Sequence, residues 1–408
     1  MLRWAGQRNI FCFLDNQQYG TPHGHYECLL AAGATASCST TLHDLDLFLR
    51  DNRGWTFGHL SYDLKNIIHG FDHHRESRVP FPPFFFFAPE CLFLLKGSEL
   101  TIRADDPGSI FREVSLVEDG EAGVTLPVEV QERISREDYL AIIQKLREHI
   151  LRGDCYEINF CQEFFSENAE IDPVAVFERL MEISPNPFSA LYRHNDQYLV
   201  CASPERFIMK QGNRLLSQPI KGTIRRDRTD AAEDLRLKAE LEASAKDRAE
   251  NVMVVDLVRN DLSRICREGS VGVVELFGVY AYPQVYQMIS TVSGELREDV
   301  SFSSILHATF PMGSMTGAPK HRVMELIDRY EVSGRGIFSG SVGYFNPEGD
   351  FDFNVVIRSI MYNAASRYLS YQAGSGITFY SDPQKEWEEC LLKAEAIKKV
   401  LTGGRSAL

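Results

Sequence analysis

The sequence lacks any apolar run of the roughly 18 to 20 residues that a transmembrane helix requires. Its first twenty residues also lack the apolar stretch and small-residue cleavage site of a signal peptide. Basic residues are in deficit, because 43 Lys and Arg face 57 Asp and Glu and the net charge is −14. This balance disfavours nucleic acid and anionic membranes as partners, since binding their phosphates needs a basic surface. We therefore expect a cytoplasmic protein.

Paired cysteines are also missing. The sequence has nine cysteines, but none forms a Cys-x-x-Cys motif, which excludes the usual zinc-ribbon and thioredoxin-like sites. Most stand among apolar residues, where a thiol usually serves as a small buried side chain. None lies in a glycine-flanked nucleophile turn, so we predict that the chain has no glutaminase of its own.

The sequence does contain enough apolar material for a large core, with 44% hydrophobic and 25% charged residues over 408 positions. We divide it into a strand-rich N-terminal region, residues 1–130, packed on the same unit, and a region of 135–400 that carries the candidate site. Helices and strands follow one another without the regular alternation of a parallel sheet. This order predicts an α+β fold with large antiparallel β-sheets and outer helices.

Local patterns predict the individual elements. Helices are expected at 135–153, 230–243, 244–265 and 317–330, and from 383 onward. Strands are expected at 156–165, 188–209, 213–225, 271–280, 341–345, 351–362 and 368–380. The aromatic segment 80–89 is predicted to be a loop that leads into a strand ending near residue 95. Residues 100–135 show little periodicity.

The last predicted helix carries a cluster of charges. Asp382 is a suitable N-cap, and Pro383 fits the first turn. At 100° per residue, Glu386, Glu389 and Lys393 fall within an arc of roughly 60°. An apolar stripe adjoins this arc: Trp387, Leu391, Ala394 and Leu401. Either these charges border a ligand site, or Glu389 and Lys393 form an ordinary surface ion pair.

A second helix repeats the arrangement. Ser244 is suited to cap it, and Asp247 and Glu250 then share one face. Two helices that each present a carboxylate pair are able to converge on Mg²⁺, which prefers oxygen ligands and often bridges carboxylates to an anionic substrate. The alternative is a capping role for Asp247 and a surface position for Glu250.

Lys221 and Glu205 are candidates for covalent and acid–base chemistry. Lys221 precedes Gly222 in Gln-Pro-Ile-Lys-Gly-Thr, and a desolvated lysine there would have a lowered pKa and act as a nucleophile. Glu205 lies in Ser-Pro-Glu-Arg. An ordinary surface lysine is the alternative for Lys221. The glycine-rich segments 313–320 and 374–376 offer backbone N–H groups to carboxylates, but neither matches a phosphate-binding P-loop.

Seven segments together resemble the chorismate-utilising enzymes, a family that includes anthranilate, aminodeoxychorismate, isochorismate and salicylate synthases. The matching motifs are SPERF (203–207), PIKGT (219–223), KDRAEN with the following VMVVDLVRNDLSRI (246–265), GSMTGAPKHRVMELID (313–328), IRS (357–359), AGSGI (373–377) and SDPQKEWEECLLKA (381–394). The resemblance implies two β-sheets packed as a sandwich, with helices outside and the active site in a cleft.

The resemblance also implies roles for individual residues. Glu250 and Glu389 would bind Mg²⁺ directly, Asp247 and Glu386 would bind it through water, and the ion would hold the ring carboxylate of chorismate. Substrate contacts would come from Gly222, Thr223, Arg358, Gly374, Ser375, Gly376 and Lys393. Thr316 and Phe338 would border the ring and its enolpyruvyl group.

The residues at two positions distinguish the members of the family. Isochorismate and salicylate synthases have a water-activating lysine where this chain has Glu157. Anthranilate synthases typically have alanine where this chain has Lys221, whereas PIKGT is typical of aminodeoxychorismate synthases. This resemblance implies amination of chorismate at C4 through a covalent adduct on Lys221, with Glu205 moving protons. A separate glutamine amidotransferase subunit would supply ammonia.

Alternatives remain at this point. Anthranilate synthesis is the second enzymatic candidate, and a metal-dependent carboxylate-binding module without catalysis is the third. Gln287 stands where many relatives have a histidine, so we expect it to form hydrogen bonds without transferring protons. Leu-Leu-Ala-Ala at 29–32 replaces a pattern associated with tryptophan feedback, which makes such feedback doubtful.

Overall fold

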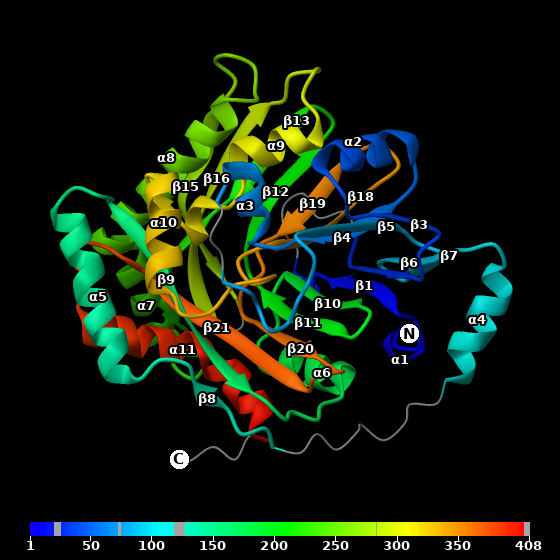
Figure 1. Ribbon diagram of the computed structural model, residues 1–408, viewed down its shortest axis with the longest axis horizontal. Coiled ribbons are helices and arrows are strands. Elements are labelled where there is room, and N and C mark those ends of the chain that lie inside the picture. The colour runs from blue at the N-terminus through cyan, green and yellow to red at the C-terminus, as the bar shows by residue number, and fades with distance from the viewer. Residues whose placement is uncertain (20–25, 72–74, 118–126, 283, 404–408) are drawn as a thin grey trace.

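The computed structural model describes residues 1–19, 26–71, 75–117, 127–282 and 284–403 (Figure 1). Two large antiparallel β-sheets pack face to face, and helices cover their outer faces. The predicted α+β fold is confirmed. None of the helices in these ranges combines the length and apolar character needed to cross a bilayer.

Within the described ranges, the first sheet has eleven strands. Their order is β17 (Gly317–Ala318), β9 (Glu157–Ser166), β21 (Tyr368–Ile377), β20 (Ser359–Asn363), β11 (Gln197–Ser203), β10 (Phe188–His194), β1 (Ile10–Asp15), β2 (Cys28–Ala32), β6 (Cys91–Lys96) and β7 (Glu99–Arg103), and β8 (Gln131–Glu132) also pairs with β9.

The second sheet has ten strands in the same part of the chain. Their order is β14 (Ile220–Arg225), β16 (Val285–Glu295), β13 (Arg214–Gln218), β12 (Arg206–Gln211), β19 (Phe351–Asn354), β18 (Ser341–Phe345), β4 (Thr56–Leu60), β5 (Phe84–Ala88) and β3 (Ala36–Cys38), and β15 (Gly272–Ala281) pairs with β16.

The helices divide between the two sheets. The first sheet packs against α1 (Leu2–Ala5), α5 (Arg136–Leu151), α6 (Pro173–Ile183), α10 (Lys320–Tyr330) and α11 (Pro383–Leu401). The large core between the sheets extends to α2 (Leu42–Asp51), α8 (Ala245–Ser263) and α9 (Phe302–Thr309). The remaining helices are α3 (Leu64–His69), α4 (Pro107–Leu116), α7 (Ala231–Ala243) and the 3₁₀ turn η1 (Gly313–Met315). In Figure 1, α11 and α5 lie along β21 and β9.

Two of the places where the chain crosses between the sheets are 204–205, from β11 to β12, and 355–358, from β19 to β20. The two crossings are bonded to each other, because Val355 N–H donates to the Glu205 carbonyl at 2.9 Å and Ser203 Oγ donates to the Val355 carbonyl at 2.5 Å. The predicted run 351–362 is therefore two strands in different sheets. These crossings place polar residues where the sheets meet.

The predicted helix starts agree with the structure where a capping side chain marks them. Ser135 accepts a hydrogen bond from Asp138 N–H at 3.1 Å at the start of α5, and Asp382 accepts from Lys385 N–H at 3.0 Å at the start of α11. The helix predicted from residue 317 begins instead at Lys320, because Gly317 and Ala318 pair with β9.

Other predictions for the N-terminal region are wrong. The segment 80–89 is not only a loop, since Phe84–Ala88 forms β5, which is buried along most of its length. A strand buried on both faces gives a continuous apolar run without alternation. Residues 100–135 include the end of β7 and the helix α4, whose Asp106 cap accepts from Ser109 N–H. The region contains the helices α1 to α4 beside the strands β1 to β7.

Candidate active site

Lys221 on β14 and Glu157 on β9 join the two sheets. The Lys221 ammonium donates to Glu157 Oε1 at 2.5 Å, and the two side chains are 11% and 3% exposed. Glu157 Oε2 is buried and has no hydrogen-bond partner among the described residues. The ion pair is thus almost completely shielded from solvent, and one oxygen of the Glu157 carboxylate accepts no hydrogen bond.

The expectation of a lowered pKa for Lys221 is wrong. Burial alone would lower the pKa of its ammonium group, but the nearby carboxylates of Glu157, Glu250 and Glu205 reverse this effect and raise the pKa above the ordinary value. The burial of this lysine agrees with a ligand site and excludes the surface alternative. Its amine is protonated in this state and must lose a proton before it acts as a nucleophile.

Two glycines shape the space around this pair. Gly222 has φ +93°, at an irregularity of the β14–β16 pairing, and a Cβ there would lie 2.9 Å from Asp247 Cβ. Gly376 is on β21, and a Cβ there would lie 2.5 Å from Glu157 Oε1 and 2.9 Å from Lys221 Nζ. The absence of a side chain at Gly376 therefore makes room for the ion pair.

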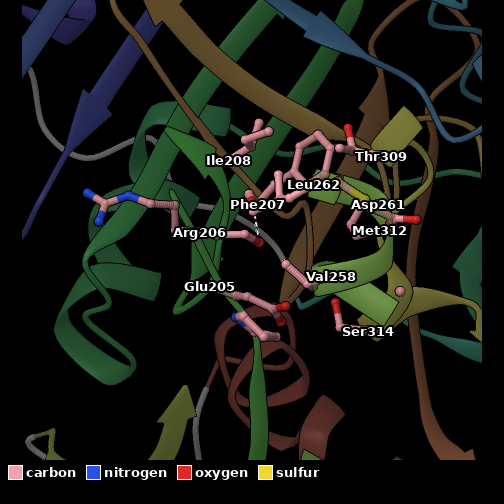
Figure 2. Close-up of a pocket in the computed structure, with 13 residues that line it drawn as sticks. Glu205, Arg206, Phe207, Ile208, Val258, Asp261, Leu262, Thr309, Met312 and Ser314 are labelled. Atoms are coloured by element: carbon pink, nitrogen blue, oxygen red, sulfur yellow. Dashed lines mark hydrogen bonds between the residues drawn. The ribbon is translucent and has the colours of Figure 1, made fainter. Parts of the chain in front are cut away.

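Glu205 lies on the crossing between β11 and β12 and is 5% exposed. Burial raises the pKa of its carboxyl group to about 7. Figure 2 shows this carboxyl group turned toward Ser314, beside a small cavity of about 20 Å³ that both residues line. A space of this size holds about one water molecule. A carboxyl group with this pKa is able to give and take protons near neutral pH.

Arg206, next to Glu205 in the sequence, points away from it (Figure 2). It is 1% exposed and forms two hydrogen bonds of 2.9 Å with Asp352, as well as one with Gln218. The Ser-Pro-Glu-Arg segment therefore combines a site carboxylate with an arginine that ties β12 to its neighbouring strands.

Helix α8 presents Glu250 and Asp247 beside β14. Ser244 caps the helix, accepts from Asp247 N–H at 3.3 Å and donates its hydroxyl to the Asp247 carboxylate. The capping alternative for Asp247 thus describes its contacts in this structure. Glu250 is not an ordinary surface residue, because its carboxylate is 13% exposed and burial raises its pKa to about 7.

Helix α11 presents Glu386 and Glu389. Glu386 is 1% exposed, whereas Glu389 forms the predicted ion pair with Lys393 at 2.7 Å, which lowers the pKa of Glu389. Leu391 was expected on the apolar face, but it is 36% exposed. The buried stripe runs instead through Trp387, Cys390, Ala394, Ile397 and Leu401, which follow one another at alternating steps of three and four residues and so share one face of the helix.

The carboxylates of the two helices suit a hard cation. Within the described ranges, no three His, Cys, Asp or Glu side chains are gathered closely enough to form a complete metal site. Glu250 Oε1 and Glu386 Oε2 are nevertheless buried without hydrogen-bond partners. The Lys246 ammonium lies 3.8 Å from Glu250 and 3.7 Å from Glu386, so a positive charge already lies between the helices. An oxygen-rich donor set with buried oxygens that accept no hydrogen bond fits Mg²⁺.

Several predicted substrate contacts lie near these groups. Arg358, at the second crossing, has φ +53° and faces Glu389, and its guanidinium has no hydrogen-bond partner in the part of the chain described. Lys393 donates to the Gly374 carbonyl at 3.0 Å. Thr223 pairs with Gln287 in the β14–β16 ladder, and Gln287 Oε1 is buried without a partner. Ser375 is 1% exposed on β21.

Thr316 and Phe338 are placed differently. The Thr316 hydroxyl is already engaged, donating to the Met312 carbonyl at 2.9 Å, and its own carbonyl accepts from Asn159 N–H. Phe338 is 2% exposed and belongs to the core between the sheets. No described contact joins either side chain to Lys221 or Glu205.

The sequence interpretation did not foresee the part that two residues play. Glu157 appeared as a replacement for the lysine of isochorismate and salicylate synthases and for the glutamine more usual in other relatives, yet it is the partner of Lys221. Lys246 belongs to the KDRAEN motif but was assigned no role. The i, i+4 spacing of Lys246 and Glu250 is a signal for one of its contacts, whereas its approach to Glu386 depends on how the helices pack.

Comparison with known proteins gives a consistent result. The chorismate binding enzyme family model matches residues 12–399. The chain is 39% identical over 277 residues to aminodeoxychorismate synthase component 1 of Escherichia coli, covering 68% of this chain and 60% of that protein. It is 39% identical over 279 residues to anthranilate synthase component 1 of Haloferax volcanii, covering 67% of this chain and 53% of that protein. The matched region thus spans little more than half the length of these relatives.

The fold has a close counterpart among solved structures. Anthranilate synthase component I from Streptococcus pneumoniae superposes with a TM-score of 0.81 at 23% identity, covering 93% of each chain. The likeness extends over both sheets, and the family match begins within β1 and ends within α11. This protein is a member of the chorismate-binding enzyme family.

Proposed function

We propose that the protein converts chorismate and ammonia into 4-amino-4-deoxychorismate through a covalent intermediate on Lys221. The observation that carries this proposal is the position of Lys221, a buried lysine at the meeting of the two sheets with a protonatable carboxyl group, Glu205, nearby. The similarity to aminodeoxychorismate synthase component 1 supports the same assignment.

Binding would rest on the charges around the pair. The unpaired guanidinium of Arg358 is suited to a substrate carboxylate. Mg²⁺ held by Glu250 and Glu389, with Asp247 and Glu386 acting through water, would supply positive charge for the ring carboxylate. The amide of Gln287 is suited to a hydrogen bond with the substrate because its oxygen is buried and unpaired.

The chemistry proceeds in two displacements. The neutral Lys221 amine bonds to C2 of chorismate, the ring double bond shifts, and the C4–O bond breaks. Glu205 gives its proton to the departing hydroxyl group, which leaves as water. Ammonia then bonds to C4, the bond between C2 and the lysine nitrogen breaks, and the Glu205 carboxylate takes a proton from the new C4 ammonium group. The enzyme returns to its starting state.

Ammonia would come from a separate glutamine amidotransferase subunit. All nine cysteines are buried, and burial raises the pKa of thiols such as Cys155 and Cys266 to about 11. None of these therefore resembles the activated thiolate that glutamine hydrolysis requires. Ammonium chloride should support product formation by this chain, whereas glutamine alone should not.

The decisive experiment identifies the product. Purified protein, chorismate, Mg²⁺ and ammonium chloride should yield aminodeoxychorismate, detected by liquid chromatography and mass spectrometry. Lys221→Ala should lose this activity, while Lys210→Ala, a lysine paired with Asp350 at the far end of β12, should retain it. Persistent amination by Lys221→Ala would contradict the proposal.

Anthranilate synthesis is the second candidate, because the similarity to anthranilate synthase component 1 is equally high. Both reactions use chorismate and ammonia, but only anthranilate formation releases pyruvate. The same assay therefore separates them, and anthranilate with stoichiometric pyruvate as the main product would favour this alternative. Lys221 argues against it, since in that reaction ammonia itself bonds to C2 and no lysine adduct is needed.

A further inference from the structure

Arg335 is a buried arginine in the loop between α10 and β18, and it is 2% exposed. Its Nε and Nη2 donate to the two oxygens of the Glu331 carboxylate at 2.9 and 2.6 Å, and its guanidinium carbon lies over the Tyr62 ring, 4.6 Å from the centroid. Burying two charges costs hydration that their attraction only partly offsets, so such a pair is weak evidence of a purely stabilising role. The planar guanidinium does provide donors in fixed directions.

The ion pair takes the place of a neighbouring strand along one edge of β9. β17 pairs with the start of β9 and β8 pairs with its far end. Between them, the Cys161 N–H donates to Glu331 Oε1 at 2.9 Å, and the Asn159 carbonyl accepts from Arg335 Nη2 at 2.9 Å. An edge without such partners would leave these main-chain groups unpaired. The ion pair thus holds β9 just beyond Glu157.

The same guanidinium also holds the 3₁₀ turn η1. Its Nη1 donates to the Met315 carbonyl at 2.7 Å and contacts Ser339 Oγ at 3.3 Å. Met315 follows Ser314, which lines the small cavity together with Glu205, and the Glu205 carboxyl group is turned toward Ser314 (Figure 2). One side chain therefore bonds to the segment that faces Glu205 and to the strand that carries the partner of Lys221.

We propose that Arg335 is a positioning residue of the active site, which joins η1 to β9 so that Ser314 faces Glu205 while Glu157 faces Lys221. This inference rests on the proposed function. In that reaction the Lys221 amine bonds to C2 as Glu205 protonates the hydroxyl group that leaves C4, so both groups must be in place in the same step. No described contact joins Arg335 to either of these two side chains, and it acts through the segments beside them.

Arg335→Lys tests the role because it keeps a positive charge beside Glu331. A lysine nitrogen cannot reproduce the fork that spans Glu331 and two main-chain carbonyls at once, so η1 and β9 are released from each other. A misplacement of about 1 Å costs roughly 10²-fold in rate, and we expect kcat with ammonium chloride to fall about 10²-fold. KM for chorismate should change little, because Arg358 and the glycines of 374–376 belong to the second crossing and to β21.

Lys65→Met is the matched control for a loss of stability. Lys65 is 1% exposed, pairs with Asp328 on α10 at 2.7 Å and lies 5.6 Å from the centroid of the same Tyr62 ring. Its described side-chain contacts reach neither η1 nor β9. This variant should lower the melting temperature and keep the wild-type kcat at temperatures well below it. A fall in kcat as large as that of Arg335→Lys would show that any loss of stability slows the reaction, and the role of Arg335 would be overturned.

Glu331→Gln is a milder variant that keeps the test decisive if Arg335→Lys does not fold. The amide retains one oxygen for the Cys161 N–H, but its NH₂ group is a donor where the guanidinium needs an acceptor, so the guanidinium must turn. We expect kcat to fall by less than in Arg335→Lys, again with KM for chorismate nearly unchanged.

The covalent adduct separates this proposal from the proposed function. With chorismate and Mg²⁺ but no ammonium, mass spectrometry should detect an adduct on Lys221 in the wild-type protein and slower adduct formation in the folded Arg335 and Glu331 variants. If the wild type forms neither product nor adduct, the proposed function fails and the role of Arg335 fails with it. If the wild type forms both and the folded variants keep its kcat, whether or not KM rises, the role of Arg335 alone is overturned.

Discussion

Gly376→Ala should inactivate the protein while leaving it folded. The added Cβ would lie 2.5 Å from Glu157 Oε1 and 2.9 Å from Lys221 Nζ, whereas ordinary contact begins at 3.4 Å. The oxygen must retreat by about 0.9 Å and the nitrogen by about 0.5 Å. Both atoms end flexible side chains, so the backbone need not move. A misplacement of about 1 Å costs roughly 10²-fold in rate, or about 2.7 kcal/mol in transition-state stabilisation.

Gly374→Ala is the matched control on the same strand. A Cβ at Gly374 would lie 1.9 Å from the Phe160 carbonyl oxygen, which is backbone in the neighbouring strand β9. That clash can be relieved only by separating the strands, so this variant should lose thermal stability. Gly376→Ala should melt close to the wild-type temperature.

The assay follows aminodeoxychorismate formation with ammonium chloride, alongside thermal unfolding of both variants. We expect Gly376→Ala to lower the rate of product formation and Gly374→Ala to lower the melting temperature. If Gly376→Ala is fully active and stable, the ion pair does not need its present position. If it unfolds instead, the space beside Glu157 serves packing and the reasoning is refuted.

Three further predictions concern other parts of the site. Burial raises the pKa of Glu205 to about 7 in the folded protein, so this carboxyl group destabilises the fold increasingly as pH rises from about 4.5 to 7. Glu205→Gln should therefore raise the free energy of unfolding at pH 8 by up to about 3 kcal/mol and should give no gain at pH 4. Denaturant titrations at the two pH values measure this difference. Lys246→Met removes the cation between two carboxylates and should tighten Mg²⁺ binding several-fold by calorimetry; weaker binding would show that Lys246 supports the site. Arg206→Ala leaves Asp352 without its buried partner and should cost about 3–5 kcal/mol of stability by chemical denaturation, and a loss below about 1 kcal/mol would contradict this role.

Local signals in the sequence predicted local structure well. Ser135, Ser244 and Asp382 marked helix starts because a capping hydrogen bond spans only two or three residues. The strand β5 escaped prediction because a strand buried on both faces shows no alternation, and its partners lie far away in the chain. The α+β fold class followed from the order of elements, whereas the assignment of strands to sheets did not.

The candidate site was also predictable only in part. The i, i+3 pairs of carboxylates on α8 and α11 were visible because a helix fixes which residues share a face. The partner of Lys221 was not visible, since Glu157 is 64 residues away and belongs to the other sheet. The direction of the Lys221 pKa shift was therefore wrong, because burial was foreseen and the neighbouring carboxylate was not.

The interleaving of early and late strands has a consequence for how the protein reaches its native state. β1 lies beside β10, and β4 pairs with β18, so strands from the start of the chain pair with strands that are made much later. Such distant pairings slow folding and leave aromatic strand edges unpaired during synthesis on the ribosome. We therefore expect cool, dilute conditions or a chaperone to raise the yield of folded protein.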